Sequence, residues 1–104
     1  MTVVKRLTKT KIESELKELD GWKFDRDFIT KTFEFKTFMA GIRFVNDVAQ
    51  IAEEEEHHPD IHIRYTTIRL SIQTHSEGGV TEWDIGLARR IENFLHQNPV
   101  TMRQ

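Results

Sequence analysis

The feature that most restricts the fold of this chain is a change of hydrophobic period, from two to 3.6 and back. Residues 28–35 alternate apolar and polar side chains, as half-buried strands do. From Thr37 the apolar residues recur three and four positions apart, which predicts a long helix ending near residue 55 or 56. Alternation then returns in residues 61–65 and 68–75. Such a chain must pack a helix against pairs of strands.

The remaining elements follow from capping and turn signals. Residues 8–19 read as an amphipathic helix capped by Thr8 or Thr10. Residues 22–24 form a first short strand, and tight turns are expected at 25–27 and 66–67. Residues 76–79 are rich in glycine and predict a flexible loop. A capping-box-like start at residues 81–84 begins a last helix, whose apolar stripe is Ile85, Ala88, Ile91 and Leu95.

The order α-β-β-α-β-β-α interleaves helices with hairpins. It predicts an α+β fold, a four-stranded antiparallel sheet with the helices packed on one face. A length of 104 residues fits one domain, 1–104. Roughly the last eight residues, which include Pro99 and the polar tail, are expected to fray. One face of the sheet would then lack a helical cover.

Composition narrows the class of protein. The absence of cysteine excludes disulfides, thiolate metal sites and a cysteine nucleophile. A net charge of −2 argues against a general nucleic-acid binder. We find no secretory signal and no apolar run of the ~18 residues that span a bilayer, so we expect a cytoplasmic protein without membrane contact.

The run Glu53-Glu54-Glu55-Glu56-His57-His58-Pro59 carries the chemistry. Imidazoles titrate near neutral pH and suit acid–base catalysis. Carboxylates at a helix C-terminus oppose the helix dipole, so helix stability does not explain them. They would favour the protonated imidazole and hold it in orientation. Glu53 lies four residues before His57, so the two would share a face if the last turn is helical.

The His-His-Pro motif and several residues further along the chain have the spacing of a known family pattern. With them the chain resembles the pterin-4a-carbinolamine dehydratase family, also known as the dimerisation cofactor of a homeodomain transcription factor. The resemblance covers roughly residues 19–94. It is carried by Gly21-Trp22, Arg26-Asp27, the stretch 33–38, Ala52-Glu53, His57-His58-Pro59, Tyr65, Leu70-Ser71, Thr74-His75 and Asp84-Ile85. The chain departs from the family at Trp83, where animal members carry a basic residue, and at Ile61, where an aromatic is common.

The resemblance implies a set of site residues. The catalytic positions fall on His57, His58, His75 and Glu53. The substrate-binding positions fall on Glu56, Gln73, Thr74, Ser76, Trp22 and Asp84. Two of these assignments compete with structural ones, because Trp22 can pack where strand meets helix and Asp84 suits the first turn of a helix. We interpret His62 and His96 as surface residues, and Glu54 and Glu55 as a solvated face.

The implied reaction is the dehydration of 4a-hydroxytetrahydropterin to quinonoid dihydropterin, in tetrahydrobiopterin recycling. It needs no cofactor and no metal. The resemblance also implies a homo-oligomer, a dimer or tetramer, and leaves a hydroxylase or transcription-factor partner untested.

Three alternatives stay open. Glu53, His57, His58, His62 and His75 offer enough ligands for zinc, although adjacent histidines are awkward for one ion. The chain could instead be a non-enzymatic interaction module or transcriptional coactivator. It could also act on another pterin, such as a folate- or molybdopterin-type ligand.

Overall fold

Helix α2, Phe38–Glu55, is the longest element, and its period of 3.6 is confirmed by the residues that it buries. Thr37 caps it, with the hydroxyl accepting from the Ala40 amide at 3.1 Å. The structure, a computed structural model, describes residues 4–98. Phe44 and Val48 are fully buried, and burial of each such side chain contributes about 1.5–3 kcal/mol.

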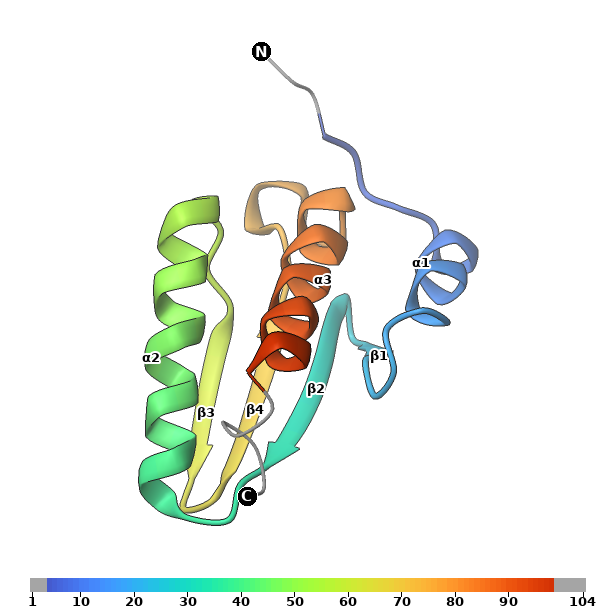
Figure 1. Cartoon of the computed structure of the whole chain (residues 1–104). Helices are drawn as coiled ribbons and strands as arrows, with labels where there is room; N and C mark the ends of the chain where they lie inside the picture. Colours follow the sequence, from blue (N-terminus) through green and yellow to red (C-terminus); the bar gives the residue numbers. More distant parts are fainter. Residues whose placement is uncertain (1–3, 99–104) are drawn as a thin grey trace.

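The predicted order of elements is confirmed. The strands are β1 Lys23–Asp25, β2 Phe28–Glu34, β3 Asp60–Arg64 and β4 Thr67–Ile72, and the other helices are α1 Lys9–Leu16 and α3 Glu82–Gln97. The strands form one antiparallel sheet in the order β1-β2-β4-β3. Helices α2 and α3 lie side by side on one face of it, and α1 packs beside β1 (Figure 1).

The core lies between the sheet and the helices. The alternation of β4 buries Ile68, Leu70 and Ile72 completely, as predicted. They meet Ile85, Ala88 and Ile91 of α3, members of the predicted stripe, within one hydrophobic cluster. The opposite face of the sheet carries polar side chains such as Thr32, His62 and Arg69, which face solvent across neighbouring strands. His62 therefore lies on the surface, as its interpretation required.

Several boundaries differ from the predicted ones. Helix α1 ends at Leu16, because the next three amides bond to carbonyls three residues back in a tighter turn that brings Leu19 into the core. The second turn falls on Tyr65 and Thr66, where Tyr65 has a positive φ of 50°. The hairpin turn at Arg26 and Asp27 has positive φ at both residues, the arrangement that matches strand twist.

The segment after β4 was predicted incorrectly. Strand β4 ends at Ile72 and not at residue 75. The expected flexible loop contains a 3₁₀ turn, η1 His75–Glu77, closed by a bridge between Thr74 and Gly79. The backbone order comes from Thr74, whose buried hydroxyl bonds to groups on α3. The predicted fraying from Pro99 lies outside the described residues.

None of the helices within residues 4–98 has the length and apolar character needed to cross a membrane.

Candidate active site

The end of α2 sends its two adjacent histidines in different directions. Glu56 adopts a left-handed conformation with φ of 53°, and the His57 amide donates to the Ala52 carbonyl at 3.0 Å. Pro59 disfavours helix at the residue before it, so the chain leaves the helix axis here. His57 turns inward to α3, whereas His58 stays exposed.

The expectation that Glu53 and His57 share a face is wrong. Glu53 instead pairs with His58, at 2.5 Å between Oε2 and Nε2. The left-handed residue between them rotates His57 away from the face that Glu53 occupies. Both members of the Glu53–His58 pair are exposed, and exposed ion pairs contribute little.

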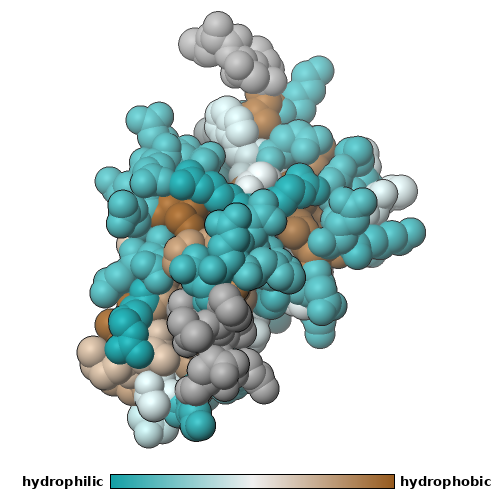
Figure 2. Space-filling view, in the orientation of Figure 1, coloured by the Kyte–Doolittle hydropathy of each residue, from teal (hydrophilic) through white to brown (hydrophobic). Residues whose placement is uncertain are grey.

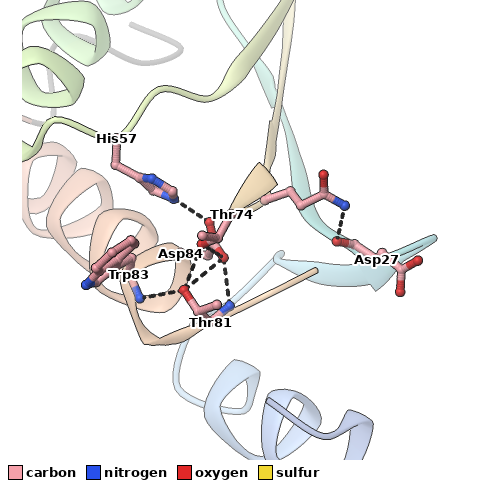
Figure 3. Close-up of polar contacts among 7 residues, drawn as sticks. Asp27, His57, Thr74, Thr81, Trp83 and Asp84 are labelled. Atoms are coloured by element: carbon pink, nitrogen blue, oxygen red, sulfur yellow. Dashed lines mark hydrogen bonds and ion pairs between the residues drawn. The ribbon is translucent and has the colours of Figure 1, made fainter. Parts of the chain in front are cut away.

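His57 pairs with Asp84 (Figure 3). Its Nε2 lies 2.5 Å from Asp84 Oδ1, and the carboxyl group is completely buried. The other oxygen, Oδ2, accepts from the Thr81 amide at 2.7 Å and from the Thr74 hydroxyl at 2.8 Å. The Thr74 and Thr81 hydroxyls are 2.7 Å apart. A buried carboxylate with this many donors is held in one orientation, and it orients the imidazole in turn.

The capping box explains how the sequence builds this arrangement. Thr81 caps α3, and its hydroxyl accepts from the Trp83 amide at 3.2 Å. In turn, the Asp84 carboxylate accepts from the Thr81 amide. Asp84 therefore has the structural role in the first turn of the helix, and it also contacts the predicted catalytic His57. Its contact with substrate stays a prediction. Among the described residues no buried side-chain nitrogen or oxygen lacks a partner.

A pocket of about 390 Å³ opens beside His57. It lies between the end of α2 and the start of α3, and its lining residues are Glu55, Glu56, His57, Glu82, Trp83 and Gly86. The Trp83 ring meets the His57 ring edge-on, with centroids 6.1 Å apart. His58 and His75 do not line this pocket, so the structure does not gather the three predicted catalytic histidines in it.

The side chains of residues 73–76 differ in their exposure to solvent. Thr74 is buried against Asp84, and His75 and Ser76 are exposed on η1. The side chain of Gln73 donates to the Asp27 carbonyl at 3.0 Å. Because Thr74 touches the partner of His57, His75 is next in the chain to the same hydrogen-bond network.

Trp22 has a structural position. It is buried in the core, its ring packs edge-on against Phe33, and its Nε1 donates to Glu92 at 2.8 Å. It does not line the pocket.

Sequence reasoning missed Arg90. Its guanidinium bonds to Glu55 at 2.6 Å and also to Glu54, and these carboxylates raise the pKa of Arg90 above its usual value. The two acids predicted as a solvated face thus tie the end of α2 to α3. No three His, Cys, Asp or Glu side chains in residues 4–98 converge as metal ligands.

Comparison with known proteins assigns the chain to a family. The profile of the family described as pterin 4 alpha carbinolamine dehydratase matches residues 5–94. A protein of Thermomicrobium roseum assigned to the pterin-4-alpha-carbinolamine dehydratases is 48% identical over 86 residues, which cover 83% of this chain and 92% of that protein. A Sulfolobus acidocaldarius protein with the same assignment is 42% identical over 89 residues, covering 86% of this chain and 98% of its own.

A solved structure agrees. The transcriptional coactivator/pterin dehydratase from Brucella melitensis superposes with a TM-score of 0.80 and 39% identity, over 85% of this chain and 96% of that one. The profile and these relatives lead to one conclusion: the chain belongs to the pterin-4a-carbinolamine dehydratase family of enzymes.

Proposed function

We propose that the chain dehydrates 4a-hydroxytetrahydropterin to quinonoid dihydropterin by histidine acid–base catalysis, in the recycling of tetrahydrobiopterin. The observation that carries the proposal is the contact between His57, at the edge of a pocket, and the fully buried carboxylate of Asp84. An imidazole held by a buried carboxylate is a favourable general base, because the carboxylate fixes the tautomer and stabilises the imidazolium that forms.

The pairing indicates which nitrogen acts. His57 Nε2 faces Asp84 and carries its proton toward the carboxylate. The remaining nitrogen, Nδ1, is then the one with a free lone pair. In the reaction the N5 lone pair forms the C4a=N5 bond, the C4a–O bond breaks, and the oxygen leaves as water after receiving a proton. We assign His57 Nδ1 to removal of the N5 proton.

The other two histidines complete the proposal. We assign His75 to the acid that protonates the leaving oxygen and His58 to binding of the 4a-hydroxyl, with Glu53 supporting His58. Both histidines are exposed and can approach a bound ligand. Glu56, Gln73 and Ser76 are proposed pterin contacts. Thr74 and Asp84 act through His57, whereas Trp22 supports the fold.

The direct test is a dehydration assay with synthetic 4a-hydroxytetrahydropterin, followed by ultraviolet absorbance as the hydroxyl leaves. Protein should accelerate the reaction well above the buffer rate, since each form of proton-transfer assistance typically contributes about 10²–10⁴-fold. A rate equal to the buffer rate would remove the enzymatic proposal.

A metal is not required by this scheme, and activity should therefore survive chelation. After exhaustive dialysis against EDTA, turnover is expected to remain within about twofold of the starting value, because imidazoles supply both proton transfers. Loss of activity that zinc restores would contradict the metal-free mechanism.

We also propose that the chain is a homo-oligomer, with a tetramer as the expected state. Strand β3 is an edge strand, which leaves backbone groups free to pair. Phe38, Met39, Ile63 and Tyr65 are large apolar side chains exposed where α2 begins and where β3 meets β4. Hydrophobic atoms gather at this end of the molecule, at the lower left of Figure 2. Exposed apolar patches of this kind mark interaction surfaces.

Light scattering should accordingly give a mass several times the 12.3 kDa of one chain. Charged substitutions at Met39 and Ile63 should lower that mass. A monomer at micromolar concentration would contradict the proposal. A cytoplasmic location stays a prediction.

A further inference from the structure

Two neighbouring positions on α3 form an open shelf beside His57. Trp83 and Gly86 are three residues apart, so they lie on the same face of the helix. Both line the pocket of about 390 Å³, a volume within the range of small-molecule sites. We call this pair of residues the shelf.

Gly86 has no structural reason to be glycine. It lies inside α3, its φ is not positive, and a Cβ built there meets nothing within 4 Å. Glycine is the poorest residue for a helix interior after proline. The missing side chain therefore has one consequence in the structure: it leaves free space in the pocket that Trp83 also lines.

Trp83 is held in place while its ring stays accessible. Its amide donates to the Thr81 hydroxyl, and its ring leans edge-on against His57. Even so, 47% of the residue is exposed. A large apolar ring that borders a pocket and remains half-exposed offers a face on which a planar ligand can stack.

We propose that the shelf binds the planar pyrimidinone ring of the pterin substrate by stacking on Trp83, with Gly86 giving the clearance. The inference rests on the proposed function and adds a binding residue to it. A ring stacked there lies next to His57, the proposed base. The 2-amino group and ring N–H of a pterin are hydrogen-bond donors, and the exposed carboxylates of Glu56 and Glu82 border the same pocket as acceptors.

Graded filling of the shelf tests this directly. Gly86→Ala, Gly86→Leu and Gly86→Phe should raise KM in that order, by about 10-fold or more for the larger two, because the new side chain occupies the ring's place. Gly86→Ala should also raise the melting temperature by about 4 °C, since alanine favours helix. Asn93→Leu places the same new side chain on an exposed position two turns further along α3, away from the pocket, and should leave KM unchanged.

Substitution of the ring gives the second measurement. Trp83→Ala should raise KM by about 10-fold with kcat and the pH profile nearly unchanged, because stacking is lost and His57 keeps Asp84. Trp83→Phe should restore most of the loss. Calorimetric titration with 7,8-dihydrobiopterin should show the same order of affinities without any need for turnover.

The outcomes separate the two proposals. If the unmodified protein turns over but Gly86→Leu and Trp83→Ala keep its KM and affinity, the shelf is refuted and the dehydratase proposal stands. If the protein binds dihydrobiopterin, loses that binding in these variants and shows no turnover, the shelf is supported and the catalytic proposal fails. Absence of both binding and turnover overturns both.

Discussion

His57→Gln is expected to lower kcat by about 10²–10³-fold, because glutamine cannot accept the N5 proton. Glutamine is preferred to alanine as the substitution, since its amide can still donate to the buried Oδ1 of Asp84. Alanine would leave that oxygen without a protein partner, and an unpaired buried polar group costs about 1–3 kcal/mol. Steady-state kinetics together with a melting curve measure both effects.

The matched control is His62→Gln, the same change on the open face of the sheet. It should change neither kcat nor the melting temperature. Glu53→Gln should have a smaller effect than loss of a histidine, because its pair with His58 is exposed. If His57→Gln and His62→Gln give the same turnover, His57 is not catalytic, and the interaction-module alternative gains support.

Asp84→Asn is the second large effect, and it should damage activity through His57. The asparagine amide would donate toward Nε2 and reverse the tautomer, so that Nδ1 carries the proton and cannot act as a base. We expect kcat to fall by about 10²–10⁴-fold. The free energy of unfolding should fall by about 1–3 kcal/mol, since the carboxylate is fully buried and hydrogen-bonded.

Thr81→Ala separates stability from chemistry. It removes the cap hydroxyl of α3 and costs about 0.5–2 kcal/mol, but it keeps the carboxylate next to His57. Its pH–rate profile should match that of the unmodified protein. An Asp84→Asn protein with unchanged turnover and pH profile would show that the pair has only a structural role.

Local patterns predicted most of the fold. The period of 3.6 in α2 and the alternation in β4 gave the right elements because each buries one face, and burial dominates the energetics. The failures occur where a tertiary contact overrides the local signal. Glycine-rich residues 76–79 read as a loop, but Thr74 is fixed by α3 and orders the turn that follows.

The candidate site shows the same division. His57 was proposed as a site residue from the histidine run, whereas the family resemblance implied Asp84, with the first turn of the last helix as its competing interpretation. Their contact was not predicted, because it spans 27 residues and depends on how α2 and α3 pack. A single left-handed residue, Glu56, decided that Glu53 pairs with His58. No periodicity reveals such a conformation in a glutamate, for which it is uncommon.

The double role of Asp84 links catalysis to the local unfolding of one helical turn. The carboxylate that starts α3 also holds the proposed base, so fraying of that turn dismantles the site even while the rest of the sheet remains folded. Activity should therefore disappear at a lower denaturant concentration than the far-ultraviolet circular dichroism signal. Hydrogen exchange at the Thr81 amide, which Asp84 protects, should accelerate over the same range of denaturant as the loss of turnover. In this molecule, local unfolding of the first turn of α3 is expected to abolish activity before the rest of the protein unfolds.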